Sequence, residues 1–224
     1  GEKVRAILQD LGLSTVCRSA RCPNASECFH DGTATFMILG DVCSRNCGFC
    51  AVTSGTPAPL DESEPARVAS AVRRMELAHA VVTSVTRDDL ADGGADHFAR
   101  TIHAIREQSA ATVEVLTPDF GGDLDALERV LSARPDVFNH NIETVRRLYD
   151  VARPQADYDQ SLAVLRGAAD RSGDDIAVKS GLMVGLGERD DELEQTFADL
   201  ASAGVRILTI GQYLAPTSAH VPID

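Results

Sequence analysis

Short apolar segments alternate with amphipathic segments along the chain. A run of four to eight apolar residues bounded by turn residues is typical of a buried strand, and apolar residues at i, i+4 and i+7 are typical of a helix that packs on one face. The apolar segments predict six strands, at residues 35–39, 80–85, 112–117, 136–139, 176–181 and 205–211. The amphipathic segments predict helices at residues 64–78, 95–108, 123–133, 142–151, 158–171 and 190–203, after a short helix within residues 1–12.

The first of the long helices illustrates the evidence for the others. Val68, Val72 and Met75 recur at helical spacing and form one apolar stripe. Ser63 precedes the helix as an N-cap, and Pro65 lies in the first turn, where a missing N–H costs nothing. Such stripes indicate core packing and not a cofactor site.

Alternation of strands with helices predicts an α/β fold with parallel strand pairing. Six strands are too few for a closed eight-stranded barrel. The pattern therefore favours a six-stranded partial (β/α) barrel, with a doubly wound open sheet as the alternative. A chain of 224 residues without a low-complexity linker fits one such unit.

Composition excludes some classes of function. The formal net charge is −13, so no basic surface is expected to replace the counterions of nucleic acid. No apolar run approaches the length of a membrane span, which predicts no membrane insertion. The chain begins at Gly1 and not at Met, so we expect a piece of a longer polypeptide in which no targeting segment can be assigned.

All six cysteines lie between Cys17 and Cys50. A disulfide framework would distribute cysteines along the chain so that they join distant loops. Cysteines gathered in one short region of a chain of this size favour metal binding in a reducing compartment.

The second half of this region carries Cys43, Cys47 and Cys50, in a loop that follows the first predicted strand. Three thiolates at x3 and x2 spacing can bind three irons of a 4Fe–4S cube and leave the fourth iron open for a substrate or cofactor. The alternatives are a zinc knuckle, which needs a fourth Cys or His nearby, and three buried structural cysteines.

The first half carries Cys17, Cys22 and Cys28, at x4 and x5 spacing. Pro23 and Asn24 interrupt any periodic pattern, which indicates a loop. The spacing is too open for the x2 pairs of a zinc knuckle. This triad could hold a second cluster or supply zinc ligands.

Polar residues follow several predicted strands, where the carboxyl ends of parallel strands gather functional groups. The candidate binding residues are Ser84, Asn139, Asn141, Lys179 and Gln212. A lysine inside a strand is costly to bury alone, so Lys179 is expected to meet an anion such as a carboxylate. His140, between the two asparagines, has the simpler interpretation of a core histidine.

The x3–x2 cysteine spacing, with Phe49 before the last cysteine, resembles the signature of the radical S-adenosylmethionine (SAM) enzymes. Over essentially its whole length the chain resembles the lipoyl synthase family. The matching segments are T-V-C-x4-C-P-N-x3-C-F, G-T-A-T-F-M-I-L-G-D, T-S-V-x-R-D-D-L-x-D-G-G-A, P-D-V-F-N-H-N-I-E-T-V-x-R-L-Y, K-S-G-L-M-V-G-L-G-E and L-T-I-G-Q-Y-L. The upstream triad discriminates this family, because most radical SAM enzymes lack it.

The resemblance implies a radical SAM partial barrel over residues 32–224 and an N-terminal cysteine-rich extension over residues 1–31. It also implies two 4Fe–4S clusters. The cluster on Cys43, Cys47 and Cys50 would bind SAM and reduce it to a 5′-deoxyadenosyl radical. That radical would abstract hydrogen from carbons 6 and 8 of an octanoyl group. The auxiliary cluster, on the upstream triad, would be consumed as the sulfur donor.

The five polar residues at the strand ends would then contact SAM. The implied partners are an octanoylated lipoyl carrier protein and an external electron donor, in the cytoplasm or, in a eukaryote, in an organelle. A biotin-synthase-like enzyme would place its auxiliary cysteines after the main triad. An electron carrier would not need six strands, and a zinc-stabilised binding module would bind zinc in place of iron.

One feature departs from the family pattern. In the family, a serine of an Arg-Ser-Ser-Tyr motif near the C-terminus is the fourth ligand of the auxiliary cluster. Residues 1–224 contain no such motif, and Ser218 lies in a different context. We therefore expect this polypeptide to hold the auxiliary cluster less firmly and to lack full activity.

Overall fold

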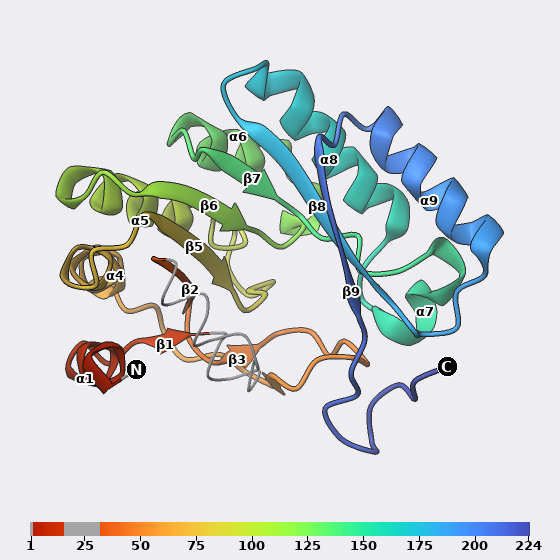
Figure 1. The fold of residues 1–224 in the computed structure, drawn as a ribbon, viewed down its shortest axis with the longest axis horizontal. Coiled ribbons are helices and arrows are strands. Elements are labelled where there is room, and N and C mark those ends of the chain that lie inside the picture. Colours follow the sequence, from red (N-terminus) through yellow and green to blue (C-terminus); the bar gives the residue numbers. More distant parts are fainter. Residues whose placement is uncertain (1, 16–31) are drawn as a thin grey trace.

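The computed structural model describes residues 2–15 and 32–224 (Figure 1). Its main sheet has seven strands in the order β1-β2-β5-β6-β7-β8-β9. Their bounds are β1 Ser14–Thr15, β2 Thr33–Ile38, β5 His79–Ser84, β6 Thr112–Leu116, β7 Val137–Asn139, β8 Ala177–Val184 and β9 Ile207–Gln212. A separate pair joins β3 (Val42–Cys43) to β4 (Thr53–Ser54). The predicted auxiliary ligands Cys17, Cys22 and Cys28 lie outside the described residues.

Six strands of the main sheet, β2 and β5 to β9, run parallel to one another. They follow one another in space in the same order as in the chain, as expected when each crossover returns beside its own strand. β1 is the exception, because it pairs with β2 in the antiparallel direction.

Helices surround the outside of the curved sheet (Figure 1). The helices, with two short 3-10 turns, are α1 Glu2–Asp10, α4 Glu64–Arg74, α5 Ala95–Gln108, η1 Phe120–Gly122, α6 Leu124–Ser132, η2 Arg146–Leu148, α7 Tyr149–Ala152, α8 Tyr158–Ser172 and α9 Asp190–Ser202. Successive long helices pack against each other, from α4 through α5, α6 and α8 to α9. Among the described residues, none of these helices combines the length and the apolar character that a bilayer crossing requires.

Local sequence explains where several helices begin. The Asp123 carboxylate accepts hydrogen bonds from the N–H groups of Asp125 and Ala126 at the start of α6. Asp157 accepts one from the N–H of Gln160 at the start of α8. Each carboxylate satisfies backbone donors that have no partner inside the helix, and its charge is favourable at the positive end of the helix dipole.

The central strands are almost continuously apolar because both of their faces are buried. Val82, Val113, Val115 and Phe138 are fully buried in one core, which also includes Ile7 of α1. The helices cover the outer face and the side chains of the barrel interior cover the other, as in other parallel sheets. The predicted partial (β/α) barrel with six parallel strands is confirmed, and β1 adds an unpredicted edge strand.

The predicted helix at residues 142–151 is wrong over its first part. There the backbone continues along β8: the N–H of Glu143 donates to the Gly181 carbonyl at 3.0 Å, and the N–H of Met183 donates to the Glu143 carbonyl at 2.9 Å. Glu143 also has a positive φ of 66°, which no helix allows. Helical structure begins only at η2, so the polar residues after β7 stay on an extended segment at the sheet edge.

Candidate metal centre and cofactor pocket

The loop that carries Cys43, Cys47 and Cys50, called the cysteine loop below, begins with an abrupt turn at the end of β2. Leu39 and Gly40 have φ of 68° and 96°, in the left-handed region that non-glycine residues rarely adopt. Both backbone groups of Leu39 are held. Its N–H donates to the Glu64 carboxylate at 2.8 Å, and its carbonyl accepts from the Arg87 guanidinium at 3.1 Å. Buried His97 contacts the same Glu64 oxygen at 2.8 Å, so the unusual turn is fixed from two sides.

The middle of the loop is held by a buried arginine. The Arg45 guanidinium makes two hydrogen bonds to Asp88, both of 2.8 Å, and two to Asp119, of 2.7 and 2.8 Å. Arg45 is 8% exposed and Asp119 is fully buried. Burial alone would raise the pKa of the Asp119 carboxyl, but the hydrogen bonds and charge of Arg45 outweigh it and lower this pKa to about 2.

The end of the loop contacts the C-terminal segment. The Val221 N–H donates to the Gly48 carbonyl at 2.9 Å, and His220 Nε2 donates to the Cys50 carbonyl at 3.1 Å. On its other side, the Gly48 N–H donates to the Ala152 carbonyl at the end of α7. Figure 1 shows the C-terminal segment turning back toward the loop beneath β9. Hydrogen bonds to backbone groups of the loop therefore fix it at both of its ends.

A pocket of about 170 Å³ lies between this loop and the carboxyl ends of the central strands. Cys43, Cys47 and Cys50 all line it, and these three are free thiols. The Cys43 sulfur accepts hydrogen bonds from the backbone N–H groups of Arg45, at 3.4 Å, and Thr86, at 3.3 Å. Two backbone N–H groups are therefore directed at this sulfur.

The thiols of Cys47 and Cys50 are neutral without a metal. Burial raises the pKa of Cys47 to about 11, against the opposing charge of Arg153, and burial also raises the pKa of Cys50. Nearby Cys43 adds to both effects. A metal bound here would have to displace protons from these sulfurs, and its positive charge would stabilise the resulting thiolates.

The opposite wall offers polar atoms that have no partner in the protein. Ser84 Oγ, Asn141 Oδ1 and His140 Nε2 are buried without a hydrogen bond, and all three residues line the pocket. Burial of such groups is costly unless a ligand satisfies them. Their donors and acceptors suit a cofactor that carries amino, carboxylate and hydroxyl groups.

His140 has only one satisfied nitrogen. Its Nδ1 lies 2.9 Å from the Thr117 carbonyl and must donate to it, which assigns the proton to Nδ1. Burial, assisted by the charge of Arg153, lowers the His140 pKa to about 4. The ring is therefore neutral near pH 7, with Nε2 free to accept a hydrogen bond in the pocket. The simple interpretation as a core histidine explains the hydrogen bond of Nδ1 but leaves the buried Nε2 without a partner.

The structure separates the five predicted binding residues into two groups. Ser84 and Asn141 line the pocket with the three cysteines. Asn139, Lys179 and Gln212 are not among its lining residues. Their contact with SAM stays a prediction.

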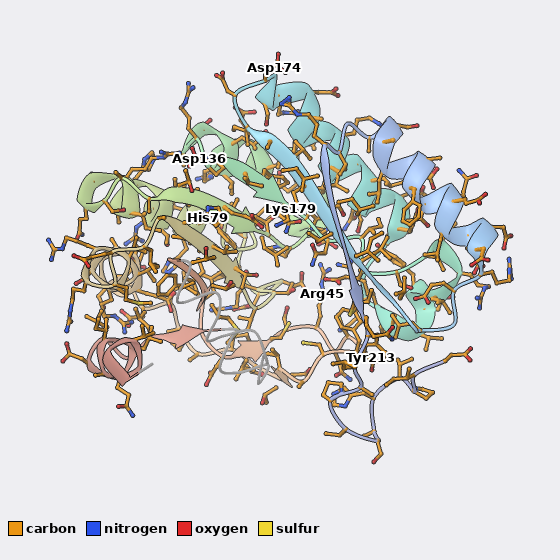
Figure 2. The ribbon with its side chains drawn as sticks, viewed as in Figure 1. Arg45, His79, Asp136, Asp174, Lys179 and Tyr213 are labelled. Carbon is orange, nitrogen blue, oxygen red and sulfur yellow. The ribbon has the colours of Figure 1, made fainter. Side chains whose placement is uncertain are left out.

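The second group has partners inside the protein. The Lys179 ammonium donates to Glu114 Oε1 at 2.8 Å, so the expected carboxylate partner is confirmed. Figure 2 labels Lys179 near the middle of the sheet. Asn139 Nδ2 donates to the same Glu114 oxygen at 3.3 Å, while its Oδ1 is buried without a partner. The Gln212 amide donates to the backbone carbonyls of Val184 and Tyr213.

The pocket also contains two charged residues: Glu143 is one of the polar residues that follow the fourth predicted strand, and Arg153 escaped the sequence analysis. Arg153 is 9% exposed and donates to the Asn141 carbonyl and the Tyr149 hydroxyl, both at 3.1 Å, while its Nε has no partner. Glu143 lies beside it, and burial raises the pKa of its carboxyl against the charge of Arg153. Arg153 follows a short helix and precedes a proline, as many exposed arginines do, so no sequence signal marks its burial.

The described part of the chain contains no set of three Cys, His, Asp or Glu side chains that converge on a single metal ion. A zinc knuckle would need that convergence. A 4Fe–4S cube binds each thiolate to a different iron, so its ligands need only surround a common space, as the three thiols around this pocket do.

The parallel partial barrel and the three-thiol loop at its carboxyl edge define a radical SAM protein. The sequence model of the Radical SAM superfamily matches residues 37–200. Solved structures share the fold at low identity. Methylornithine synthase PylB aligns with a TM-score of 0.65 at 15% identity, over 97% of this chain and 65% of that one. The FeFe-hydrogenase maturase HydG of Carboxydothermus hydrogenoformans aligns with a TM-score of 0.68 at 17% identity, over 86% of this chain and 46% of that one.

Curated relatives define the family within this class. A lipoyl synthase of Rubrobacter xylanophilus is 58% identical over 99% of this chain and 69% of its own length. The lipoyl synthase of Caldanaerobacter subterraneus subsp. tengcongensis is 53% identical over 99% of this chain and 78% of its own length. That of Nitratidesulfovibrio vulgaris is 57% identical over 98% of this chain and 73% of its own length. The chain belongs to the lipoyl synthase family of radical SAM enzymes.

Proposed function

We propose that this chain catalyses the reaction of its family, the insertion of sulfur at carbons 6 and 8 of a protein-bound octanoyl group. The observation that carries the proposal is the pocket in which three free thiols face buried polar atoms without partners. Family membership implies SAM and a 4Fe–4S cluster as cofactors. When bound, they supply the reducing electron and the radical chemistry needed to break unactivated C–H bonds.

The proposed cluster ligands are Cys43, Cys47 and Cys50. Their fit to a cluster rests on the free thiols that share one pocket and on the N–H groups directed at the Cys43 sulfur. The cluster would use three thiolates and leave one iron for the amino and carboxylate groups of SAM.

We assign the positioning of SAM to the opposite wall. Ser84 and Asn141 can satisfy its polar groups with the atoms that now lack partners, and neutral His140 can accept one hydrogen bond at Nε2. The apolar parts of the wall, which include Met37, Val85 and Leu116, would exclude water from the reacting groups. Lys179 remains a candidate for a contact only if SAM displaces it from Glu114, whereas Asn139 could use its unpartnered Oδ1 without leaving Glu114.

We further propose that Cys17, Cys22 and Cys28 hold an auxiliary 4Fe–4S cluster as the sulfur source, within an extension over residues 1–31. The spacing of this triad and its position before the main one support the assignment. An octanoylated lipoyl carrier protein and an external electron donor would complete the reaction. The gathering of all six cysteines in one short region fits a reducing compartment such as the cytoplasm.

Metal analysis tests the assignment. Protein reconstituted without oxygen should hold about eight iron and eight sulfide per chain, as two 4Fe–4S clusters require. Replacing Cys43, Cys47 and Cys50 by alanine should halve both counts and remove the response of the cluster spectrum to SAM. The same replacement of Cys17, Cys22 and Cys28 should halve the counts but keep that response. Zinc at both triads of protein purified without oxygen would contradict the proposal.

A further inference from the structure

We propose that Arg45 is a positioning residue for the cluster: its ion pairs to Asp88 and Asp119 hold the cysteine loop so that two backbone N–H groups point at the Cys43 sulfur. The inference rests on the proposed function, because it assumes a cluster bound at Cys43.

The ion pairs connect three separate segments. Arg45 lies in the cysteine loop, Asp88 follows β5, and Asp119 follows β6. Four hydrogen bonds of 2.7 to 2.8 Å engage four of the five N–H donors of the guanidinium. The planar fork of arginine makes two bidentate pairs at once, a geometry that the single ammonium of lysine cannot reproduce.

The same segments supply the donors to the sulfur. One N–H at the Cys43 sulfur belongs to Arg45 itself and the other to Thr86, two residues before Asp88. Ser44 fastens these segments further: its N–H donates to the Thr86 carbonyl at 3.0 Å, and its hydroxyl donates to Asp88 at 2.9 Å. The side-chain ion pairs therefore control the direction of both backbone donors.

Arg45 is unsuited to act on a ligand directly. It does not line the pocket, and its donors are occupied by carboxylates. Asp119 is fully buried and also accepts the Gly121 N–H at 3.0 Å, so it holds a fixed position to which the loop attaches. A rigid support of this kind is what keeps the ligands of a metal site in place.

Hydrogen bonds to cluster sulfurs stabilise the reduced, more negative state and so raise the reduction potential. Loss of the Arg45 support should lower the potential of the cluster and expose its iron to chelators. This signature differs from that of a purely structural ion pair, whose loss would lower the melting temperature and leave the potential unchanged.

Three variants test the proposal on the full, reconstituted chain. Arg45→Lys keeps the charge and loses the bidentate geometry. Arg45→Gln with Asp119→Asn removes both buried charges together, so the net charge stays constant and no lone charge remains buried. Asp88→Asn removes the charge of the half-exposed partner of Arg45. It leaves the buried Arg45–Asp119 ion pair intact, so this variant is expected to fold. The matched controls are Arg134→Lys and the double variant Arg134→Gln with Asp175→Asn, at an ion pair whose side chains are both 73% exposed.

Two measurements, neither of which depends on turnover, decide the outcome. They are the reduction potential of the SAM-responsive cluster, followed by electron paramagnetic resonance, and the rate of iron loss to a chelator. Arg45→Lys and the Arg45 double variant should show a more negative potential and iron loss about 10- to 100-fold faster. Asp88→Asn should show smaller changes of the same sign, and the controls should show none.

The inference is overturned if the Arg45 variants match the controls in both measurements, whatever their melting temperatures. Absence of a SAM-responsive cluster from the unaltered protein would instead overturn the proposed function, and this inference with it.

Discussion

At the scale of single residues, the pocket depends on polar groups that burial has altered. His140 is neutral because its ring is buried near the positive charge of Arg153. Cys47 keeps its proton because its sulfur is buried beside two other thiols. Each of these buried groups is costly without a bound partner. The histidine offers a hydrogen-bond acceptor to a ligand, and in the proposed site the thiols would exchange their protons for iron. Such residues mark functional sites better than exposed charges do.

The depressed pKa of His140 predicts a specific dependence of stability on pH. The pKa of His140 is about 4 in the folded protein and the ordinary pKa of histidine is 6.5, so unfolded chains take up a proton first as the pH falls. The contribution of neutral His140 to the free energy of unfolding is thus complete above about pH 6.5. The free energy of unfolding should then fall by about 3 kcal/mol between pH 6.5 and pH 4. The His140→Gln variant should lose this slope when urea unfolding of the cluster-free protein is followed against pH.

Exposed His103 on α5 supplies the control, because His103→Gln removes a histidine without touching the pocket. The groups that face His140 are Arg153, Arg45, Asp119 and the Thr117 carbonyl. The Asp119 pKa of about 2 places its own contribution below about pH 4, outside this window. An unchanged slope in His140→Gln would show that His140 does not titrate as described.

At the scale of elements, the end of β2 determines where the cysteine loop begins. Leu39 turns the chain and packs against the start of α5, where Gly94 has a φ of 92°. A Cβ at Gly94 would lie 2.4 Å from Leu39 Cδ1. Glycine is required here both by the backbone conformation and by the close approach of the leucine.

Replacing Gly94 by alanine should therefore lower the free energy of unfolding by more than the strain of the left-handed backbone conformation alone. Gly121 is the matched control, since its φ is 62° and nothing lies within 4 Å of its Cβ position. We expect Gly121→Ala to cost about 1–2 kcal/mol, from the left-handed backbone only. Gly94→Ala should cost about 1–3 kcal/mol more, from the displaced Leu39. Equal free energies of unfolding for the two variants would show that Leu39 moves aside freely.

A second element-scale contact joins β6 to β8 inside the barrel. Lys179 and Glu114 form an ion pair with side chains that are 19% and 8% exposed. Lys179→Met alone should destabilise the protein by about 3–5 kcal/mol, because it leaves the Glu114 carboxylate buried without its cation. Adding Glu114→Leu should recover most of that loss, as measured by chemical denaturation.

The double variant also tests the predicted contact of Lys179 with SAM. If the ion pair is only structural, Lys179→Met with Glu114→Leu should fold and bind SAM as the unaltered protein does. If SAM engages Lys179, affinity for SAM should fall in the folded double variant. Equilibrium binding to the reconstituted protein separates these two results.

At the scale of the whole molecule, the sequence determined the architecture more clearly than the site. The six parallel strands could be predicted because each is a short apolar run, although only the central ones are buried on both faces and β9 is mostly exposed. Residues 142–151 were misread because Val145, Leu148 and Tyr149 have near-helical spacing, while the pairing of Glu143 with β8 depends on contacts distant in sequence. The cysteine spacing predicted that Cys43, Cys47 and Cys50 act together, and they do line one pocket, whereas the burial of Arg45 and Arg153 arises only when the loops meet.

The central claim is that Cys43, Cys47 and Cys50 make this chain a radical SAM enzyme, with the upstream triad needed only for sulfur insertion. The most direct test incubates reconstituted protein with SAM, a strong reductant and an octanoyl-lysyl peptide, and measures 5′-deoxyadenosine by chromatography and the peptide by mass spectrometry. Cys47→Ala should form neither 5′-deoxyadenosine nor sulfur-containing peptide. Cys22→Ala should form 5′-deoxyadenosine but no sulfur-containing peptide. Formation of lipoyl peptide by Cys47→Ala would contradict the account.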